Sequence, residues 1–217
     1  MSDSIVHRPV SRAQFLRNSA KGGLALAVGG SVLASVQGVA FAAGVSDNST
    51  LQAAYAAESL AVHVYEGVLA NFSSFKNPKL MNIDYFQHAL SNEKAHKAFL
   101  GAALGSKAPT GLTLTIPASA LKSGQAVLNF GVALETAFVE TYLGAVETLT
   151  STDLKLVAAK VAANEATHFS FFDAAAGGHG VLPSLPSTVT VSQAAGVLTP
   201  YIPNLTARLT AAGFPNA

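Results

Sequence analysis

The 217-residue chain contains no cysteine and no tryptophan, and only 12% of its residues are charged. Without cysteine there can be no disulfide framework, no thiolate zinc site, no cysteine nucleophile and no iron–sulfur cluster of the usual kind. Any bound metal must therefore be held by nitrogen and oxygen. The formal net charge is only +1 and the sequence has no basic run, so we expect no nucleic acid among its partners. Half of the residues are hydrophobic, which is enough to bury the core of one domain.

The N-terminal region has a very uneven distribution of charge. Four basic residues lie among the first 21, and no Asp, Glu, Lys or Arg occurs from Gly22 to Ser46. A basic segment, then an apolar segment, then Ala40-Phe41-Ala42 is typical of a cleaved export signal. We expect residues 1–43 to be such a signal, with cleavage after Ala42 or Ala43. The mature protein would then be periplasmic or secreted.

Two features of this region leave alternatives open. Residues 11–16 resemble the twin-arginine export motif, although Ala13 stands where that motif has its second arginine. If the signal were not cleaved, residues 22–46 would be long enough to span a bilayer, and only then would the protein be attached to a membrane. The glycines and polar residues of this stretch make it weakly hydrophobic, which favours the cleaved signal.

Apolar residues recur at helical spacing in four long stretches after the signal. The predicted helices span about 49–72, 81–104, 124–149 and 151–177, with Ser49, Ser151 and Gly105 as capping residues. Short connections predict that the first two helices form one antiparallel hairpin and the last two another. A long linker, residues 107–123, allows the crossover between the hairpins, and Thr113–Ile116 within it is expected to be extended. The sequence predicts an all-α four-helix bundle over residues 44–178.

Residues 179–217 are rich in proline and are expected to form a tail that packs on the bundle. Prolines from Pro183 onward exclude another long helix, whereas Ser192–Leu198 fits a short one. Apolar faces rich in alanine and glycine are compatible with a homodimer.

The second and fourth predicted helices each carry a Glu-x-x-His motif, and the first and third add one carboxylate each. Three residues turn a helix by about 300°, so the Glu and His of each motif share one face and can hold one metal together. All four glutamates lie about 13 to 15 residues from their hairpin turns, which places them in one layer of the bundle. The six candidate ligands are Glu58, Glu93, His96, Glu135, Glu165 and His168.

The surroundings of these residues favour a metal site over a solvated helix face. The neighbouring sequence is almost wholly apolar, and an unpaired buried carboxylate costs several kcal/mol unless a cation neutralises it. Tyr65 and Tyr142 each follow a candidate glutamate by seven residues and could hydrogen-bond a ligand, and Glu66 is a weaker candidate for such a supporting contact. Other polar residues are expected to face away from the site or to lie in solvent: His63, His88, Glu140 and His179.

The combined pattern resembles the ferritin-like di-iron carboxylate superfamily, and within it the ferritin-like domain family of exported bacterial and desiccation-related plant proteins. The resemblance covers about residues 47–178. It is carried by Leu134-Glu135, Tyr142-Leu143-Gly144-Ala145, Glu93-Lys94-Ala95-His96 with Leu104-Gly105, and Asn164-Glu165-Ala166-Thr167-His168. The resemblance implies that Glu58 and His96 bind one metal, that Glu135 and His168 bind the other, and that Glu93 and Glu165 bridge the two.

A carboxylate-rich, nitrogen-poor donor set suits two iron ions, with manganese second and zinc third. We therefore expect an exported, redox-active protein, an oxidase, a ferroxidase or a peroxide-consuming enzyme, with O₂ or peroxide as its small-molecule substrate. A role in oxidative or desiccation stress fits this activity. Two other interpretations stay open at this point: an iron-binding or storage protein without turnover, and a structural envelope bundle with a vestigial metal site.

Overall fold

The computed structural model describes residues 45–75 and 82–214, and these residues form helices and no strand. The helices are α2 (Val45–Ala70), α3 (Ile83–Leu104), α4 (Gly124–Thr148), α5 (Thr152–Ala176), α6 (Val191–Leu198) and α7 (Leu205–Ala211). Short 3₁₀ turns follow α2 at Phe72–Ser74 and α3 at Gly105–Lys107. The predictions for the export signal and for the start of the second helix at Met81 lie outside the described residues. None of the helices described is long and apolar enough to cross a membrane.

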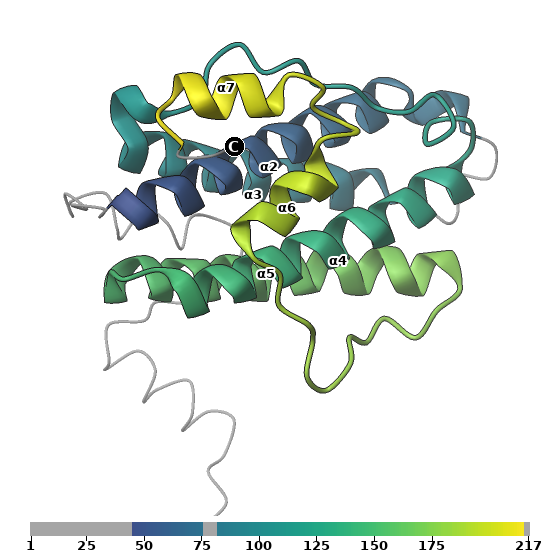
Figure 1. Ribbon diagram of the computed structural model, residues 1–217. Coiled ribbons are helices and arrows are strands. Elements are labelled where there is room, and N and C mark those ends of the chain that lie inside the picture. Colours follow the sequence, from purple (N-terminus) through teal and green to yellow (C-terminus); the bar gives the residue numbers. More distant parts are fainter. Residues whose placement is uncertain (1–44, 76–81, 215–217) are drawn as a thin grey trace, which may run out of the picture. The chain divides into compact units, whose positions relative to one another are not determined.

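The four long helices form two antiparallel hairpins that together make the bundle. Helix α2 packs mainly against α3, and α4 packs mainly against α5. Figure 1 shows the two hairpins with α6 crossing from one to the other and α7 lying along α2. The predicted all-α four-helix bundle is confirmed.

Capping residues explain most of the helix ends. The side chain of Ser123 accepts a hydrogen bond from the backbone N–H of Ala126 at the start of α4, and Ser151 caps α5 in the same way. Gly105 ends α3 with φ +55°, and Gly177 ends α5 in the left-handed region, which glycine adopts without strain. The starts of α4 and α5 and the ends of all three helices lie within two residues of the predicted positions.

Helix α2 begins four residues before Ser49, so the prediction of Ser49 as its first capping residue is wrong. Asp47 lies in the additional first turn, where a negative charge interacts favourably with the helix dipole. The Asp47 carboxylate is fully buried and accepts hydrogen bonds from the backbone N–H groups of Thr150 and Ser151. This tertiary contact with the α4–α5 turn holds the extra turn in place.

The crossover and the tail pack together on the bundle. Thr113–Ile116 has no regular secondary structure, and the backbone N–H of Thr115 donates to the carbonyl of Tyr201 at 2.9 Å. Helix α6 contacts α2 and α4. The sequence interpretation missed α7, whose two leucines, Leu205 and Leu209, are one turn apart and are buried in the core. The spacing of these leucines is the signal that could have revealed it.

Candidate metal centre

All six residues predicted as ligands point into one layer at the middle of the bundle. Glu58 is on α2, Glu135 on α4, and the two Glu-x-x-His motifs are on α3 and α5. The four glutamates have no exposed surface, and the exposed fractions of His96 and His168 are 6% and 2%. The core around them contributes no lysine or arginine among the buried residues. Burial of four carboxylates in an apolar core is costly unless cations or protons compensate for their charge.

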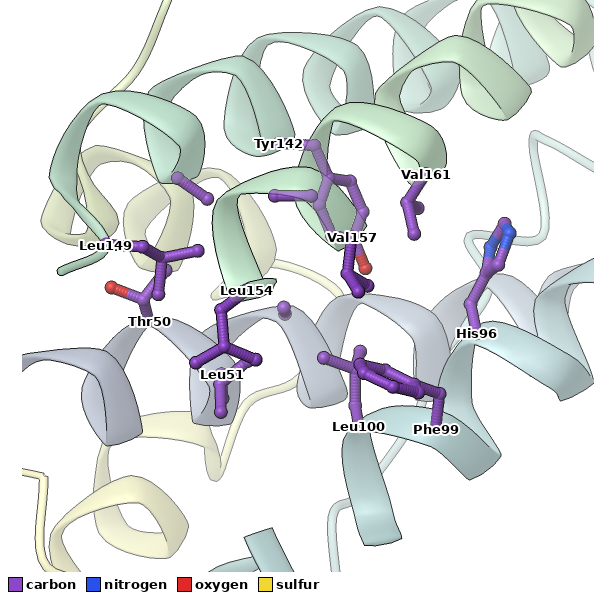
Figure 2. A pocket seen from close by; sticks show the side chains of 13 residues that line it. Thr50, Leu51, His96, Phe99, Leu100, Tyr142, Leu149, Leu154, Val157 and Val161 are labelled. Atoms are coloured by element: carbon purple, nitrogen blue, oxygen red, sulfur yellow. The ribbon is translucent and has the colours of Figure 1, made fainter. Parts of the chain in front are cut away.

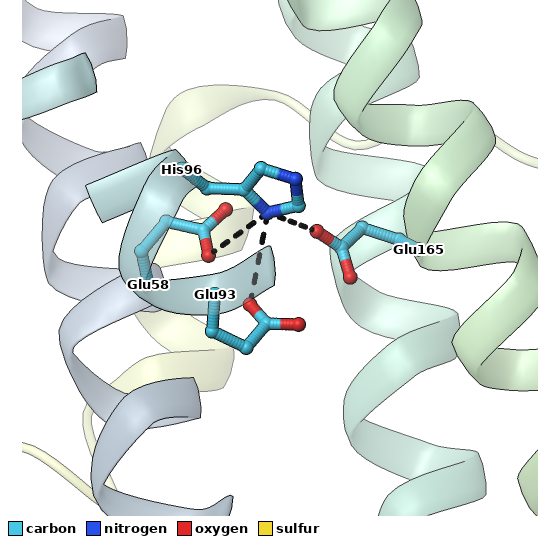
Figure 3. Close-up of side chains that lie close together, drawn as sticks. All are labelled: Glu58, Glu93, His96 and Glu165. Carbon is cyan, nitrogen blue, oxygen red and sulfur yellow. Dashed lines mark ion pairs between the residues drawn. The ribbon is translucent and has the colours of Figure 1, made fainter. Parts of the chain in front are cut away.

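The imidazole of His96 faces three carboxylates from three helices (Figure 3). Its Nδ1 atom lies 3.0 Å from a carboxylate oxygen of Glu165, 3.6 Å from Glu58 and 3.8 Å from Glu93. A ring nitrogen can carry only one proton, so it cannot donate to all three oxygens. The arrangement is therefore suited to a cation placed between these atoms.

His168 has an equivalent environment in the other half of the layer. Its Nδ1 atom lies 2.8 Å from Glu93, 3.0 Å from Glu165 and 3.8 Å from Glu135. The donors thus form two groups, each with ligand atoms within 4.8 Å of one another, and both groups contain Glu93 and Glu165. One group adds Glu58 and His96 and the other adds Glu135 and His168, which is the division that the family resemblance implies. That ions bind in this division stays a prediction.

The two tyrosines bond to carboxylates of the opposite hairpin. The hydroxyl of Tyr65 on α2 donates to Glu135 Oε1 on α4 at 2.8 Å, and the hydroxyl of Tyr142 on α4 donates to Glu58 Oε1 on α2. Burial, together with the charge of the carboxylate partner, raises the pKa of both phenols well above 10, so both remain protonated donors. Each tyrosine fixes one oxygen of its glutamate and leaves the other oxygen directed at the centre.

The pKa shifts differ between the two kinds of carboxylate in the centre: those in both donor groups, Glu93 and Glu165, and those in one group, Glu58 and Glu135. Burial raises the pKa of Glu58 to about 7, with Glu93 adding to the effect, and burial also raises the pKa of Glu135. Burial and the charge of Glu165 also favour a higher pKa for Glu93, but the contacts of Glu93 with both imidazoles outweigh them and lower its pKa. The pKa of both imidazoles is raised: burial opposes their charge, but the surrounding carboxylates favour it more strongly. Without metal, protons therefore supply part of the missing positive charge.

Unused hydrogen-bonding atoms show that the donor set fits a metal. Several buried atoms of the centre have no hydrogen-bond partner among the described residues, because the close contacts to the imidazoles lack hydrogen-bond geometry. They are Glu58 Oε2, both carboxylate oxygens of Glu93, His96 Nδ1, Glu135 Oε2 and Glu165 Oε1. Unpaired buried polar atoms are rare in folded proteins. Oxygen and nitrogen donors of this kind could hold metal ions.

Glu66 is not part of this layer. Its side chain is half exposed on α2 and forms an ion pair at 2.8 Å with Lys94. Eight residues from Glu58, it is rotated far enough around α2 to face solvent, so the suggestion of a supporting contact is wrong. The other polar residues that were set aside lie outside both donor groups: His63 and Glu140 are half-buried, and His88 and His179 are exposed.

Sequence reasoning missed Asn92 and Tyr85. The Asn92 amide lies 3.3 Å from Nε2 of His168, the ring nitrogen that faces away from the carboxylates. Tyr85 stacks on Phe171 with ring centroids 3.5 Å apart and meets the His168 ring edge-on. An asparagine directly precedes the glutamate of both motifs, as Asn92 and Asn164, and this repeated residue is the signal that could have revealed the contact.

Comparison with known proteins gives one informative result. A family model described as a ferritin-like domain matches residues 46–178, which covers more than half of the chain. A search of curated proteins returns no match.

Proposed function

The chain belongs to the ferritin-like domain family, and from this premise we propose that it binds a pair of iron ions and uses them in redox chemistry. The observation that carries the proposal is the pair of donor groups that share Glu93 and Glu165. Glu93 and Glu165, with the ligands of each group, would hold two cations, whose charge would neutralise that of the four buried carboxylates. The preponderance of oxygen donors favours iron, with manganese as the second choice and zinc as the third.

Bound as a ferrous pair, the ions would supply two electrons, which reduce one dioxygen to hydrogen peroxide with uptake of two protons and leave both ions ferric. The residues of the chain prepare the site for this chemistry. Tyr65 and Tyr142 fix the unshared carboxylates, so that Glu135 and Glu58 each present one oxygen. The apolar helix faces exclude bulk water, which strengthens the interactions of the donors with a cation.

Asn92 would accept the ring proton of His168 when a metal is bound. If Nδ1 binds a cation through its lone pair, the ring proton must be on Nε2, which then donates to Asn92. The amide must accordingly present its oxygen to the ring, and the two ends of an amide are exchanged by a simple rotation. Such outer contacts orient metal-bound imidazoles.

Anaerobic loading with ferrous ion, followed by admission of air, tests the proposal. We expect binding of two equivalents of iron and a rapid ferric absorption change. Glu93→Ala and His168→Ala should abolish the change, whereas His88→Ala, which removes an exposed imidazole, should leave it intact. An unchanged signal in the two site variants would refute the assignment. Two bound irons without oxidation would favour iron binding without turnover, and no bound metal would favour a structural bundle.

We also propose that the protein is exported, on the basis of the charge distribution of residues 1–46. Intact-mass measurement of the protein from its native cell would test this proposal. A mature chain that begins near Ala43 or Gly44 supports it, and a chain that retains Arg8 and Arg12 contradicts cleavage.

A further inference from the structure

The two halves of the bundle repeat the same donors at the same spacing. The interval from Glu58 to Glu135 equals the interval from Tyr65 to Tyr142. In the same way, the interval from Glu93 to Glu165 equals the interval from His96 to His168. Each position of α2 therefore has an equivalent on α4, and each position of α3 has one on α5. This correspondence allows the surroundings of the two imidazoles to be compared residue by residue.

A pocket lies next to the ligand layer, on the side of His96. It is enclosed by α2, α3, α4 and α5 and runs from His96 and Tyr142 toward Thr50 and Leu149 (Figure 2). We call the part of the core that contains this pocket the His96 side. Its walls include Leu100, Ala145, Val157 and Ala158, which are buried and apolar.

The equivalent region next to His168, which we call the His168 side, is filled by aromatic rings. Phe172 takes the position equivalent to Leu100, Phe86 that of Ala158, and Tyr85 that of Val157. Phe86 and Phe172 have ring centroids 5.7 Å apart. A Cβ atom placed on Gly131 would lie 2.3 Å from the Phe172 ring, so this ring packs directly on the backbone of α4.

The size and chemistry of the pocket restrict what it can hold. The cavity has a volume of about 20 Å³, which is roughly the room for one small molecule of one or two heavy atoms. Most of its walls are hydrocarbon, and the Tyr142 hydroxyl is already used by Glu58. A polar molecule such as hydrogen peroxide would lose hydrogen bonds to water on entering, whereas dioxygen has none to lose.

We propose that this pocket holds dioxygen next to the centre, so that the oxidant arrives from the His96 side and not from the His168 side. The inference rests on the proposed function, because it assigns a route to the reactant of the same centre. It assigns a distinct role to small side chains at positions 145 and 158, which the ligand pattern alone does not explain. It also makes the pocket selective for dioxygen over hydrogen peroxide.

The metal-free protein provides the first test, which does not depend on activity. Crystals or solutions under xenon pressure should show xenon between Leu100 and Val157 in the wild-type protein, because apolar cavities bind this gas. Ala158→Val, and independently Ala145→Val, should remove it. Ala89→Val is the matched control, since Ala89 is an equally buried alanine equivalent to Val161 on the other side. Absence of xenon from the wild-type pocket, or its retention in both pocket variants, would overturn the proposal.

The iron-loaded protein provides the second test. Both pocket variants should bind ferrous ion with the wild-type stoichiometry and react several-fold more slowly with dioxygen, while the rate with hydrogen peroxide is unchanged. Ala89→Val should react with both oxidants as the wild type does. Equal rates with dioxygen in all variants, or a parallel fall with both oxidants, would overturn the proposal. Failure of the wild type to bind iron would instead refute the proposed function, and xenon in the pocket would then mark a simple void.

Discussion

The His96 side and the His168 side carry the same donors in different surroundings. On the His96 side the pocket walls are mostly aliphatic, with Leu100, Ala158 and Val157 beside the rings of Phe99 and Tyr142. On the His168 side the positions equivalent to these three aliphatic residues are Phe172, Phe86 and Tyr85. The ligands must match because two ions in one layer need the same kinds of atoms. The residues around the ligands have no such constraint. Because they differ while the ligands match, we attribute the binding of ions to the ligands and the control of access to the surrounding residues.

The largest effect is expected where the two sides share a ligand. Glu93→Gln should abolish tight binding of both ions, because both donor groups contain Glu93. Glu58→Gln and Glu135→Gln should each remove one ion, since each carboxylate belongs to one group. Metal content of the purified variants measures this, with Glu66→Gln as the surface control. Loss of a single ion from Glu93→Gln would contradict the shared role.

The stability of the metal-free protein should fall as the pH rises from 5 to 8. Glu58 has a pKa of about 7 in the folded state and an ordinary value of 4.5. As the pH rises, the unfolded chain therefore loses the proton of Glu58 at a lower pH than the folded protein does. In this interval the folded state binds more protons, and its free energy of unfolding decreases with pH by roughly 3 kcal/mol from Glu58 alone. The raised pKa values of Glu135 and both imidazoles act with the same sign.

Urea unfolding at several pH values measures this dependence. The metal-loaded protein is the control, because bound cations replace the protons and should flatten the profile between pH 6 and 8. A metal-free protein that becomes more stable with rising pH would contradict the assignment of raised carboxylate pKa values.

Gly131→Ala should distinguish the filled side from the open side. The added methyl group would meet the Phe172 ring at 2.3 Å, and overpacking of this kind costs about 1–3 kcal/mol. The equivalent position on the His96 side, Ala54, already carries that methyl group beside the pocket. Gly196→Ala in α6 is the matched control, since nothing lies within 4 Å of its added carbon. Equal stability of the two variants in thermal unfolding would show that Phe172 can move away.

The smallest effects are expected from the tyrosines. Tyr65→Phe removes one hydrogen bond from Glu135, and Tyr142→Phe removes one from Glu58, at a cost of about 1 kcal/mol each. Each substitution should weaken one of the two binding steps in a metal titration and leave the other near its wild-type value. A variant that weakens both steps equally would contradict the pairing of each tyrosine with one side.

The sequence predicts that the six candidate ligands meet in one layer, because this meeting depends on helix geometry alone. A Glu and a His three residues apart share a helix face, and equal distances from the hairpin turns place four glutamates at one level. Capping residues such as Gly105 and Ser151 likewise mark helix ends through local chemistry. The sequence leaves the partner of each tyrosine open, because the crossing from α2 to α4 depends on how the hairpins dock.

The features that the sequence interpretation missed depend on contacts between distant segments. The extra turn of α2 is held by the bonds of Asp47 to the α4–α5 turn. The contact of Asn92 with His168 joins α3 to α5. The pocket results from the summed volumes of side chains from four helices, and neither periodicity nor a motif reports such a sum.

Anomalous diffraction from crystals grown with ferrous ion tests the central claim most directly. We expect two peaks in one layer, one beside Nδ1 of His96 and one beside Nδ1 of His168, with Glu93 and Glu165 between them. A single peak, or peaks located away from these four residues, would contradict it.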